Sequence, residues 1–378
     1  MAGEPAAGRD HDGPEVIELS SVPGFVVFDL SGAPHSAGGT RLAPDVSVAE
    51  VALLARAMTY KFAALGARMG GAKAGVRGDP ADRAGKAVLM ARFCAEIAPL
   101  ADAGRLLTGP DMGTAEEDFA PLRENQAAPA AISAVVDGVP FEDLLTGYGV
   151  AAAAEAALAA RWGGGWDGRS VAIEGFGKVG GGVAREVTRR GGRVVAVSTV
   201  AGCLADSAGL DVDRLLALRW AHGDACVLQY GRPAGPPREL FTEVEADVVV
   251  PGTRPAVISG WTAARLPAGV RVVAPAANVP YTARGADVLR RRGIVALPDF
   301  VCNAGGVIGY RSADGASPEE VLASVNTTIT GLIRDALGHP GGPIAGACER
   351  AGAFLRGWWG EPPSPPFAPE PLVDPDTV

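Results

Sequence analysis

Two lysines twelve positions apart are the residues of this chain best suited to acid–base chemistry. Lys61 ends the segment Met58-Thr-Tyr-Lys61, and Lys73 ends the segment Gly70-Gly-Ala-Lys73. Only four of the 34 basic residues are lysine, so arginine supplies nearly every other cation. Arginine stays charged at any working pH, whereas a lysine in a dry pocket can lose its proton and act as an acid or base. We therefore expect at least one of the two lysines to do chemistry. The alternative is a solvated lysine, in a glycine turn or on a helix surface.

Asp111 is the third residue of this kind. It lies in Thr108-Gly-Pro-Asp111-Met-Gly113, a loop bounded by glycine and proline. Taken alone, an aspartate in such a loop is a turn residue. Together with Lys73 it becomes a candidate proton shuttle, because a carboxylate beside an amine can move protons to and from a substrate.

A glycine-rich segment predicts a dinucleotide site. The sequence Ser170-Val-Ala-Ile-Glu-Gly-Phe-Gly-Lys-Val-Gly180 places GxGxxG between an apolar strand and a helix, as such a site requires. The glycines allow a tight turn and close approach of a pyrophosphate to the helix N-terminus. The predicted cofactor contacts are Gly175, Phe176, Gly177, Lys178, Val179 and Gly180.

The choice between NAD and NADP stays open. The strand after the glycine loop, residues 193–198, is where an NAD enzyme carries an acid for the ribose hydroxyl. Here Ser198 is followed by Thr199 at the expected place of the acid, and we include both as cofactor contacts. Loss of the carboxylate removes a repulsion against a 2′-phosphate, but no arginine immediately follows Thr199 to bind one. We therefore expect NAD or NADP as the cofactor, and we favour NADP or the use of both dinucleotides.

Two asparagines follow apolar strands. Asn278 lies in Ala276-Ala-Asn278-Val-Pro280, and Asn303 lies in a Pro-Asp-Phe-Val-Cys-Asn-Ala-Gly-Gly run. Ligands of open α/β sheets bind at the carboxyl ends of parallel strands, so both are candidate ligand contacts. A turn asparagine is the alternative for each.

The order of elements predicts an α/β fold with two domains. Val/Ile/Ala runs at 171–174, 193–198, 248–251, 270–274 and 293–297 alternate with helical segments, as in a parallel sheet with crossovers. Before them, a strand at 24–29 and a helix from Ser47 open a separate N-terminal α/β domain. We expect helices at 318–336 and 343–356, the first with Ser317 as its N-cap.

The predicted domain limits follow from these elements. Residues 16–138 form a substrate and catalytic domain, and residues 139–317 form a Rossmann-type dinucleotide-binding domain across a cleft. Helices within 318–358 are expected to pack back on the first domain. Residues 1–15 and 361–378 are rich in proline, glycine and acids, so we expect both to be mobile.

Composition limits the possible functions. The chain has 378 residues, 48% of them hydrophobic, which suits a globular protein with large cores. A net charge of −9 argues against nucleic acid as a partner, and no basic run suggests a membrane surface. Scattered cysteines and the absence of a secretory signal pattern lead us to expect a cytoplasmic protein. No histidine–cysteine cluster predicts a metal site.

Taken together, these segments resemble the glutamate/leucine/phenylalanine/valine dehydrogenase family. The resemblance covers roughly residues 36–310, and the order of the motifs with the twelve-residue lysine spacing is highly specific in combination. The motifs, in order, are GGTR ending at Arg41, MTYK, GGAK, GPDMGT, TGYGV from Thr146, GFGKVG and PDFVCNAGG.

The resemblance implies reversible oxidative deamination of an L-amino acid to a 2-oxo acid and ammonia, with hydride passing between the substrate Cα and the nicotinamide. It implies that Lys61 binds the substrate α-carboxylate. Lys73 activates the attacking water, and Asp111 moves protons to and from the amino nitrogen. Thr146 and Asn278 match contacts on the nicotinamide side, and Asn303 matches a residue near the substrate carboxylate. Family members are oligomers, so a homo-oligomer is expected.

Departures from the family pattern bear on the substrate. Glutamate-specific members usually carry a lysine immediately before the GGxR segment, where this chain has Ala37, next to Gly38 and Gly39. A buried carboxylate without a cation partner is costly, so glutamate is not expected. The leucine, phenylalanine and valine branch fits better, although Tyr310 stands where a small aliphatic residue is usual. We include Ala37, Gly39 and Tyr310 among the substrate contacts.

The expected substrate is a hydrophobic, aromatic or non-proteinogenic amino acid. Two alternatives stay open. One is a reductive aminase or imine-forming dehydrogenase of a biosynthetic pathway, and the other is a catalytically idle nucleotide-binding protein of the same fold.

Overall fold

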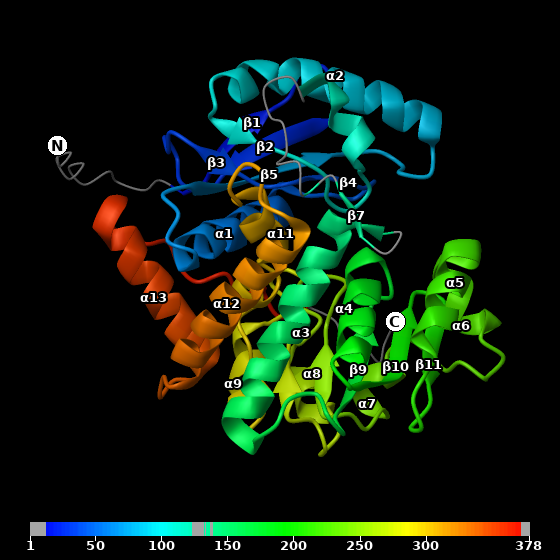
Figure 1. Cartoon of the computed structure of the whole chain (residues 1–378). Coiled ribbons are helices and arrows are strands. Elements are labelled where there is room, and N and C mark those ends of the chain that lie inside the picture. Colours follow the sequence, from blue (N-terminus) through cyan, green and yellow to red (C-terminus); the bar gives the residue numbers. More distant parts are fainter. Residues whose placement is uncertain (1–12, 123–131, 133, 137–138, 372–378) are drawn as a thin grey trace. The chain divides into compact units, whose positions relative to one another are not determined.

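The computed structural model describes residues 13–122, 132, 134–136 and 139–371 (Figure 1). The chain divides into two compact units, Met1–Ala127 with Cys348–Pro366 and Ala128–Ala347 with Phe367–Val378. Each unit builds its own sheet, so the expected two-domain α/β fold with a Rossmann-like second domain is confirmed. The expected limits of the domains, 16–138 and 139–317, stay predictions.

The first unit contains a six-stranded mixed sheet. Its order is β1-β2-β5-β3-β6, and β4 pairs in parallel with β5. The strands are β1 Glu15–Glu18, β2 Gly24–Phe28, β3 Ser36–Ala37, β4 Thr40–Leu42, β5 Gly70–Val76 and β6 Leu106–Leu107.

Helices cover both faces of this sheet (Figure 1). Helix α1 (Val48–Ala64), capped by Ser47, packs against Phe25 and Val27, and helix α2 (Arg83–Asp102) packs against Val26 and Phe28. The faces alternate along each strand because successive side chains point to opposite sides. A 3₁₀ helix, Glu116–Leu122, adds Phe119 and Leu122 to the core beneath α2.

The second unit contains a doubly wound sheet. Its order is β11-β10-β9-β12-β13-β14, with every pair parallel except β10 and β11. The strands are β9 Ser170–Glu174, β10 Arg193–Thr199, β11 Gly202–Ala205, β12 Val248–Val250, β13 Val272–Val273 and β14 Val295–Ala296. All five predicted strands are present. A short hairpin, β7 (Val135–Val136) with β8 (Val139–Pro140), precedes the sheet.

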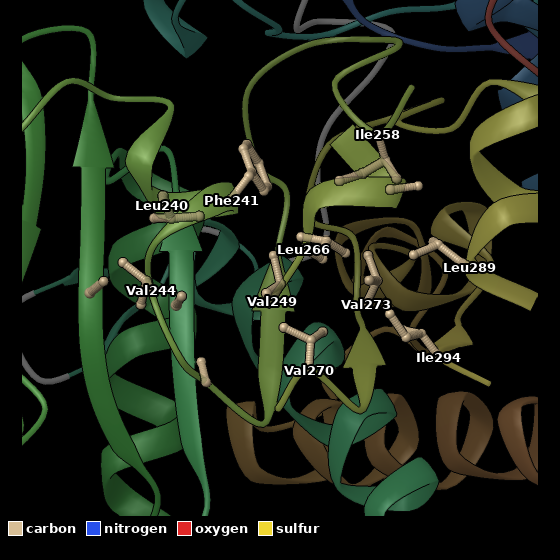
Figure 2. Packing of buried hydrophobic residues seen from close by; sticks show 14 of the residues in the cluster. Leu240, Phe241, Val244, Val249, Ile258, Leu266, Val270, Val273, Leu289 and Ile294 are labelled. Carbon is tan, nitrogen blue, oxygen red and sulfur yellow. The ribbon is translucent and has the colours of Figure 1, made fainter. Parts of the chain in front are cut away.

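Helices lie on both faces of the second sheet. One face packs against α3 (Phe141–Trp162) and α4 (Lys178–Arg189). Figure 2 shows the other face, where Val249 and Val273 of the sheet pack on side chains from or beside α7 (Glu239–Thr242), α8 (Gly260–Arg265) and α9 (Ala283–Arg291). The remaining helices are α5 Val212–His222, the 3₁₀ turn η2 Gly223–Ala225, α6 Cys226–Gln229, α10 Asp299–Cys302 and α11 Gly305–Tyr310.

Two long helices close the chain, near the ranges that the sequence predicted. Helix α12 (Pro318–Leu337) begins at Ser317 with a full capping box, as expected. Its apolar face, which includes Val325 and Ile329, packs on α3 within the second unit. That helices within 318–358 pack back on the first domain stays a prediction. Only the part of α13 (Pro343–Trp358) from Cys348 onward belongs to the first unit.

The mobility of the termini stays a prediction, but part of the C-terminal stretch forms hydrogen bonds to both units. The carbonyls of Pro363 and Ser364 accept hydrogen bonds from Tyr60 and Arg56 at 2.6 and 3.0 Å. Farther on, the amide of Ala368 donates to the Tyr281 carbonyl at 2.9 Å. These bonds hold the stretch 361–371 in place despite its prolines, and Glu15 is likewise held in β1. Residues 1–12 and 372–378 lie outside the described part. Within that part, no helix has the length and apolar character needed to cross a membrane.

Candidate active site

Lys73 lies in the middle of β5, on the face of the sheet that α1 covers. Its neighbours Ala72 and Ala74 point to the opposite core, so alternation turns Lys73 toward α1. The residue is 5% exposed. A Cβ at Gly38 would lie 1.8 Å from the Ala72 carbonyl oxygen and 3.4 Å from Cδ of Lys73. Glycine at position 38 therefore lets the chain pass close to the Ala72 carbonyl, beside the lysine side chain.

Lys61 is positioned by the docking of α1 on β5. The amide of Gly71 donates to the Thr59 hydroxyl at 2.9 Å, and that hydroxyl donates to the buried Asp29 carboxylate at 2.6 Å. A Cβ at Gly71 would lie 1.9 Å from the Ala55 carbonyl oxygen, so the helix approaches the strand this closely only over glycine. Lys61 follows Thr59 by two residues, in the last turn of α1, and is 5% exposed.

Asp111 reaches Lys73 from the loop after β6. The loop runs beside β4, because the amide of Leu42 donates to the Met112 carbonyl at 2.9 Å and Thr40 forms a bridge with Pro110. Nζ of Lys73 and Oδ2 of Asp111 are 2.5 Å apart. The structure therefore brings the two predicted catalytic residues into direct contact. Gly39 borders this loop, since a Cβ there would lie 2.6 Å from the Pro110 carbonyl oxygen.

Two further charged residues of the first unit lie at this site, and no sequence motif predicted a role for them. Arg41 on β4 forms an ion pair with Glu50 in the first turn of α1. Its other terminal nitrogen, Nη2, lies 3.6 Å from Oδ1 of Asp111. Burial raises the pKa of Asp111, but the charges of Lys73 and Arg41 outweigh it, so this pKa lies well below its ordinary value. Asp111 is therefore a carboxylate at any working pH.

The glycine loop of the second unit has the geometry of a pyrophosphate site. Gly175 has a φ of +85°, which favours glycine, and a Cβ at Gly180 would lie 1.9 Å from the Gly175 carbonyl oxygen. A Cβ at Gly177, the N-cap of α4, would meet nothing within 4 Å, and no side chain caps this helix. The space beside Gly177 at the start of α4 is therefore open to an anion, so the residues present fit a dinucleotide.

The other predicted residues of the glycine loop divide between packing and exposure. Phe176 is buried, Val179 is half-buried and Lys178 is exposed. Glu174, which was not predicted as a site residue, accepts hydrogen bonds from the amides of Gly252 and Thr253 at 2.9 and 3.2 Å. Burial raises the pKa of this carboxyl. Its position as the last strand residue before GxGxxG was the available signal.

Ser198 and Thr199 are buried at the end of β10. The Ser198 carbonyl accepts a hydrogen bond from the Gly175 amide at 3.0 Å, which joins the strand to the glycine loop. The Thr199 hydroxyl donates to the Asp224 carbonyl at 2.7 Å. Thr199 therefore uses its hydroxyl to hold the segment after α5.

The two predicted asparagines are brought together at the carboxyl ends of β13 and β14. Nδ2 of Asn303 donates to the carbonyls of Ala276 and Ala277 and to Oδ1 of Asn278, each at 3.1 Å. Asp299 accepts a hydrogen bond from the Val279 amide at 2.8 Å and so fixes the Asn278 loop on α10.

Thr146, Tyr310 and Ala37 complete the predicted set. Thr146 on α3 lies beside α11, since a Cβ at Gly306 would lie 3.5 Å from its hydroxyl. Tyr310 is 37% exposed, and its hydroxyl donates to Glu142 at 2.9 Å. Ala37 is half-buried on β3, in the first unit. Among the described residues, no group of three or more histidine, cysteine or carboxylate side chains could hold a metal ion.

Comparison with known families identifies the class of protein that this fold and these two sites define. The profile of the Glutamate/Leucine/Phenylalanine/Valine dehydrogenase family matches residues 138–312, and that of the Glu/Leu/Phe/Val dehydrogenase dimerisation domain matches residues 22–127. The chain belongs to this family of amino acid dehydrogenases, which are oxidoreductases.

Named relatives narrow the comparison. Glutamate dehydrogenase of Aeropyrum pernix is 31% identical over 282 residues, which cover 72% of this chain and 66% of the relative. Glutamate dehydrogenase of Thermotoga maritima is 32% identical over 284 residues, which cover 71% and 67%. Both relatives are glutamate dehydrogenases, so the comparison does not support the expected closeness to the leucine, phenylalanine and valine branch.

Solved structures agree on the fold. The hetero-hexameric glutamate dehydrogenase from Thermus thermophilus, in a leucine-bound form, gives a TM-score of 0.74 at 27% identity and covers 88% of this chain and 84% of that chain. L-tryptophan dehydrogenase from Nostoc punctiforme gives a TM-score of 0.61 at 21% identity, with 91% and 97% covered. At that identity the second likeness concerns the fold alone.

Proposed function

We propose that the protein catalyses the reversible, NAD(P)-dependent oxidative deamination of an L-amino acid to its 2-oxo acid and ammonia. The observation that carries this proposal is the contact of 2.5 Å between Lys73 and Asp111 in a unit that also buries Lys61. An amine and a carboxylate in contact suit a reaction that moves protons between water, a substrate nitrogen and the protein.

Each of the three residues has a role in this scheme. Lys61 is a buried cation that binds the substrate α-carboxylate as a point charge. Lys73 removes a proton from the water that attacks the substrate carbon. Asp111 exchanges protons with the amino nitrogen, and its lowered pKa keeps it ionised before the substrate binds.

The second unit binds the dinucleotide in this proposal. Gly177 and the first turn of α4 hold the pyrophosphate, while Thr146 and Asn278 contact the nicotinamide side. The cofactor, when bound, takes up or gives back the hydride. Thr199 brings no carboxylate to the ribose, so NAD and NADP are both compatible with this chain, with a lean to NADP or dual use.

The proposed substrate is not glutamate. By the family resemblance, glutamate-specific members carry a lysine where this chain has Ala37, and a side-chain carboxylate there would lack that partner. The relatives named above are glutamate dehydrogenases at about one-third identity, so the proposal rests on Ala37 and not on their names. A hydrophobic, aromatic or non-proteinogenic amino acid, as in the leucine, phenylalanine and valine branch, fits best.

The proposal includes a homo-oligomer. The family profile over residues 22–127 describes a dimerisation domain, and the Thermus enzyme is a hetero-hexamer.

A reductive aminase of a biosynthetic pathway is the second candidate function, favoured by Tyr310, which replaces the usual small residue.

A spectrophotometric screen at about 340 nm tests the proposal. The purified protein is mixed with the common L-amino acids and then with aromatic and non-proteinogenic ones, with NAD⁺ and NADP⁺ in parallel. We expect reduction with one class of apolar substrate and little with glutamate. Glutamate as the best substrate would refute the specificity. No reduction with any amino acid, despite measurable dinucleotide binding, would refute the deamination and favour an idle binding protein.

A further inference from the structure

We propose that Arg41 is a positioning residue for the reaction: its guanidinium, held between Glu50 and Asp111, sets the charge state of the Lys73–Asp111 pair. This inference rests on the proposed function, because the pair is catalytic only there. It adds Arg41 and Glu50 to Lys61, Lys73 and Asp111.

The contacts form a row of alternating charges. Glu50 of α1 pairs with Arg41 of β4, Arg41 lies 3.6 Å from Asp111, and Asp111 lies 2.5 Å from Lys73 of β5. Lys61, also buried, adds a positive charge from α1. Every element that contributes a charged side chain to this row belongs to the first unit.

Arg41 acts on Asp111 through charge and not through a hydrogen bond. Its side chain is 8% exposed, and a distance of 3.6 Å exceeds that of a good hydrogen bond. Oδ1 of Asp111 instead accepts from the Met112 amide at 2.6 Å, which leaves Oδ2 for Lys73. Nε of Arg41 has no hydrogen-bond partner within the described residues. A purely structural arginine would use its donors more fully than this one does.

The arrangement has a chemical consequence. The positive charge of Arg41 offsets part of the negative charge of Asp111. The attraction between the Asp111 carboxylate and the ammonium group of Lys73 is therefore weaker. Glu50 limits this effect from the far side. Removing Arg41 should therefore strengthen this attraction, and removing the charge of Glu50 should weaken it. A merely structural role would not produce opposite effects.

The scarcity of lysine makes a direct test practical. Trace labelling with acetic anhydride, measured by mass spectrometry over a range of pH, follows Lys73 beside only three other lysines. In Arg41→Met the labelling midpoint of Lys73 should rise by about one pH unit. In Glu50→Gln it should fall, and Arg41→Lys should lie closer to the wild type. Arg105→Met, which removes an ion pair with Glu15 elsewhere in the same unit, is the matched control and should change nothing.

The outcomes separate this inference from the proposed function. The inference would be overturned if the labelling midpoint of Lys73 were the same in the wild type, Arg41→Met and Glu50→Gln. This holds even if the enzyme deaminates amino acids. Opposite shifts in a protein that oxidises no amino acid would support the charge control and refute the reaction. With an active enzyme, the acid limb of the kcat/KM profile should move in the same directions as the labelling midpoints. If Arg41→Met fails to fold, Glu50→Gln and Arg41→Lys decide the question.

Discussion

At the scale of single residues, the contact between Lys73 and Asp111 makes the most direct prediction. Lys73→Ala should reduce kcat to below a few per cent of the wild-type value, and Asp111→Asn should reduce it by about 10²–10⁴-fold, since each removes a proton-transfer group. Dinucleotide affinity, measured by fluorescence titration, should change little in both variants because the glycine loop is untouched. Near-normal kcat in either variant would remove that residue from the mechanism.

Ala37 carries the prediction on specificity. Ala37→Lys should raise kcat/KM for L-glutamate about tenfold or more, because a hydrogen bond to a charged group contributes about 1.5–3 kcal/mol. Ala37→Met is the matched control, since it adds similar length without the charge. An equal effect of both substitutions, or none from lysine, would show that Ala37 does not border the substrate side chain. Steady-state rates with glutamate and with the best apolar substrate give the answer.

The sequence predicted Lys61, Lys73 and Asp111 as a group, because rare lysines and a Gly/Pro-bounded loop stand out. It did not predict the roles of Arg41 and Glu50. Arginine is the ordinary cation of this chain, so Arg41 has no distinctive composition signal. Its importance depends on the pairing of β4 with β5 and on the start of α1 beside it, which only the folded chain shows.

At the scale of elements, the turn from β9 into α4 separates two roles of glycine. Gly177→Ala places a methyl group in open space at an ordinary φ of −91°, so stability should stay within about 0.5 kcal/mol. Dinucleotide affinity should nevertheless fall, because the methyl group occupies the approach of the pyrophosphate. Titration calorimetry with NAD⁺ and NADP⁺ measures this loss.

Gly180→Ala is the matched variant. Its methyl group would lie 1.9 Å from the Gly175 carbonyl oxygen, so the strand and helix must separate. Stability should fall by about 1–3 kcal/mol, together with binding. If Gly177→Ala bound the dinucleotide as tightly as the wild type, the assignment of this loop would be wrong.

Glu96 gives α2 a pH-dependent attachment to the turn between β1 and β2. Its carboxylate accepts bonds from the amides of Ser20 and Ser21 at 2.6 and 2.8 Å and from both hydroxyls. Led by the Ser20 amide, these bonds lower the pKa of Glu96 from 4.5 to about 2. The stabilisation is therefore complete above pH 4.5 and is lost as the pH falls toward 2.

Glu96→Gln should consequently lower Tm at neutral pH and flatten the fall of Tm between pH 4.5 and 2. Glu18→Gln, at an exposed position of β1 in the same unit, is the control. Thermal unfolding by circular dichroism across this pH range measures the effect. Parallel Tm curves for the wild type and Glu96→Gln would contradict it.

The elements that could be predicted are those with clear helix caps, apolar spacing or apolar runs in the sequence. Helices α1 and α12 have serine caps and apolar spacing, and the five parallel strands are apolar runs. Helix α2 was not predicted, since Gly85 and Pro99 interrupt it and its buried stripe is narrow. Strand β11 is short, and its antiparallel pairing with β10 depends on the turn at Val200 and Ala201.

At the scale of the whole molecule, the stretch 361–371 contributes to both units. In the first unit it forms hydrogen bonds with Tyr60 and Arg56, and in the second it forms hydrogen bonds with Tyr281 and Thr282. The proline-rich composition favoured a mobile tail. The stretch 361–371 nevertheless forms these bonds, because backbone carbonyls and amides can bind to a folded surface without forming a helix or a long strand.

Deleting residues 361–378 should therefore destabilise both units. Burial of Tyr60 raises its pKa and makes a lost hydrogen-bond partner costly, and each lost bond removes about 0.5–1.5 kcal/mol. Tm should fall, and amide hydrogen exchange should quicken around Tyr60 in one unit and around Thr282 in the other. Deletion of residues 372–378 alone, which spares all four of these bonds, is the control and should leave both segments protected. Faster exchange in only one unit would mean that the tail stabilises that unit alone, and unchanged exchange in both would mean that the bonds contribute nothing to stability.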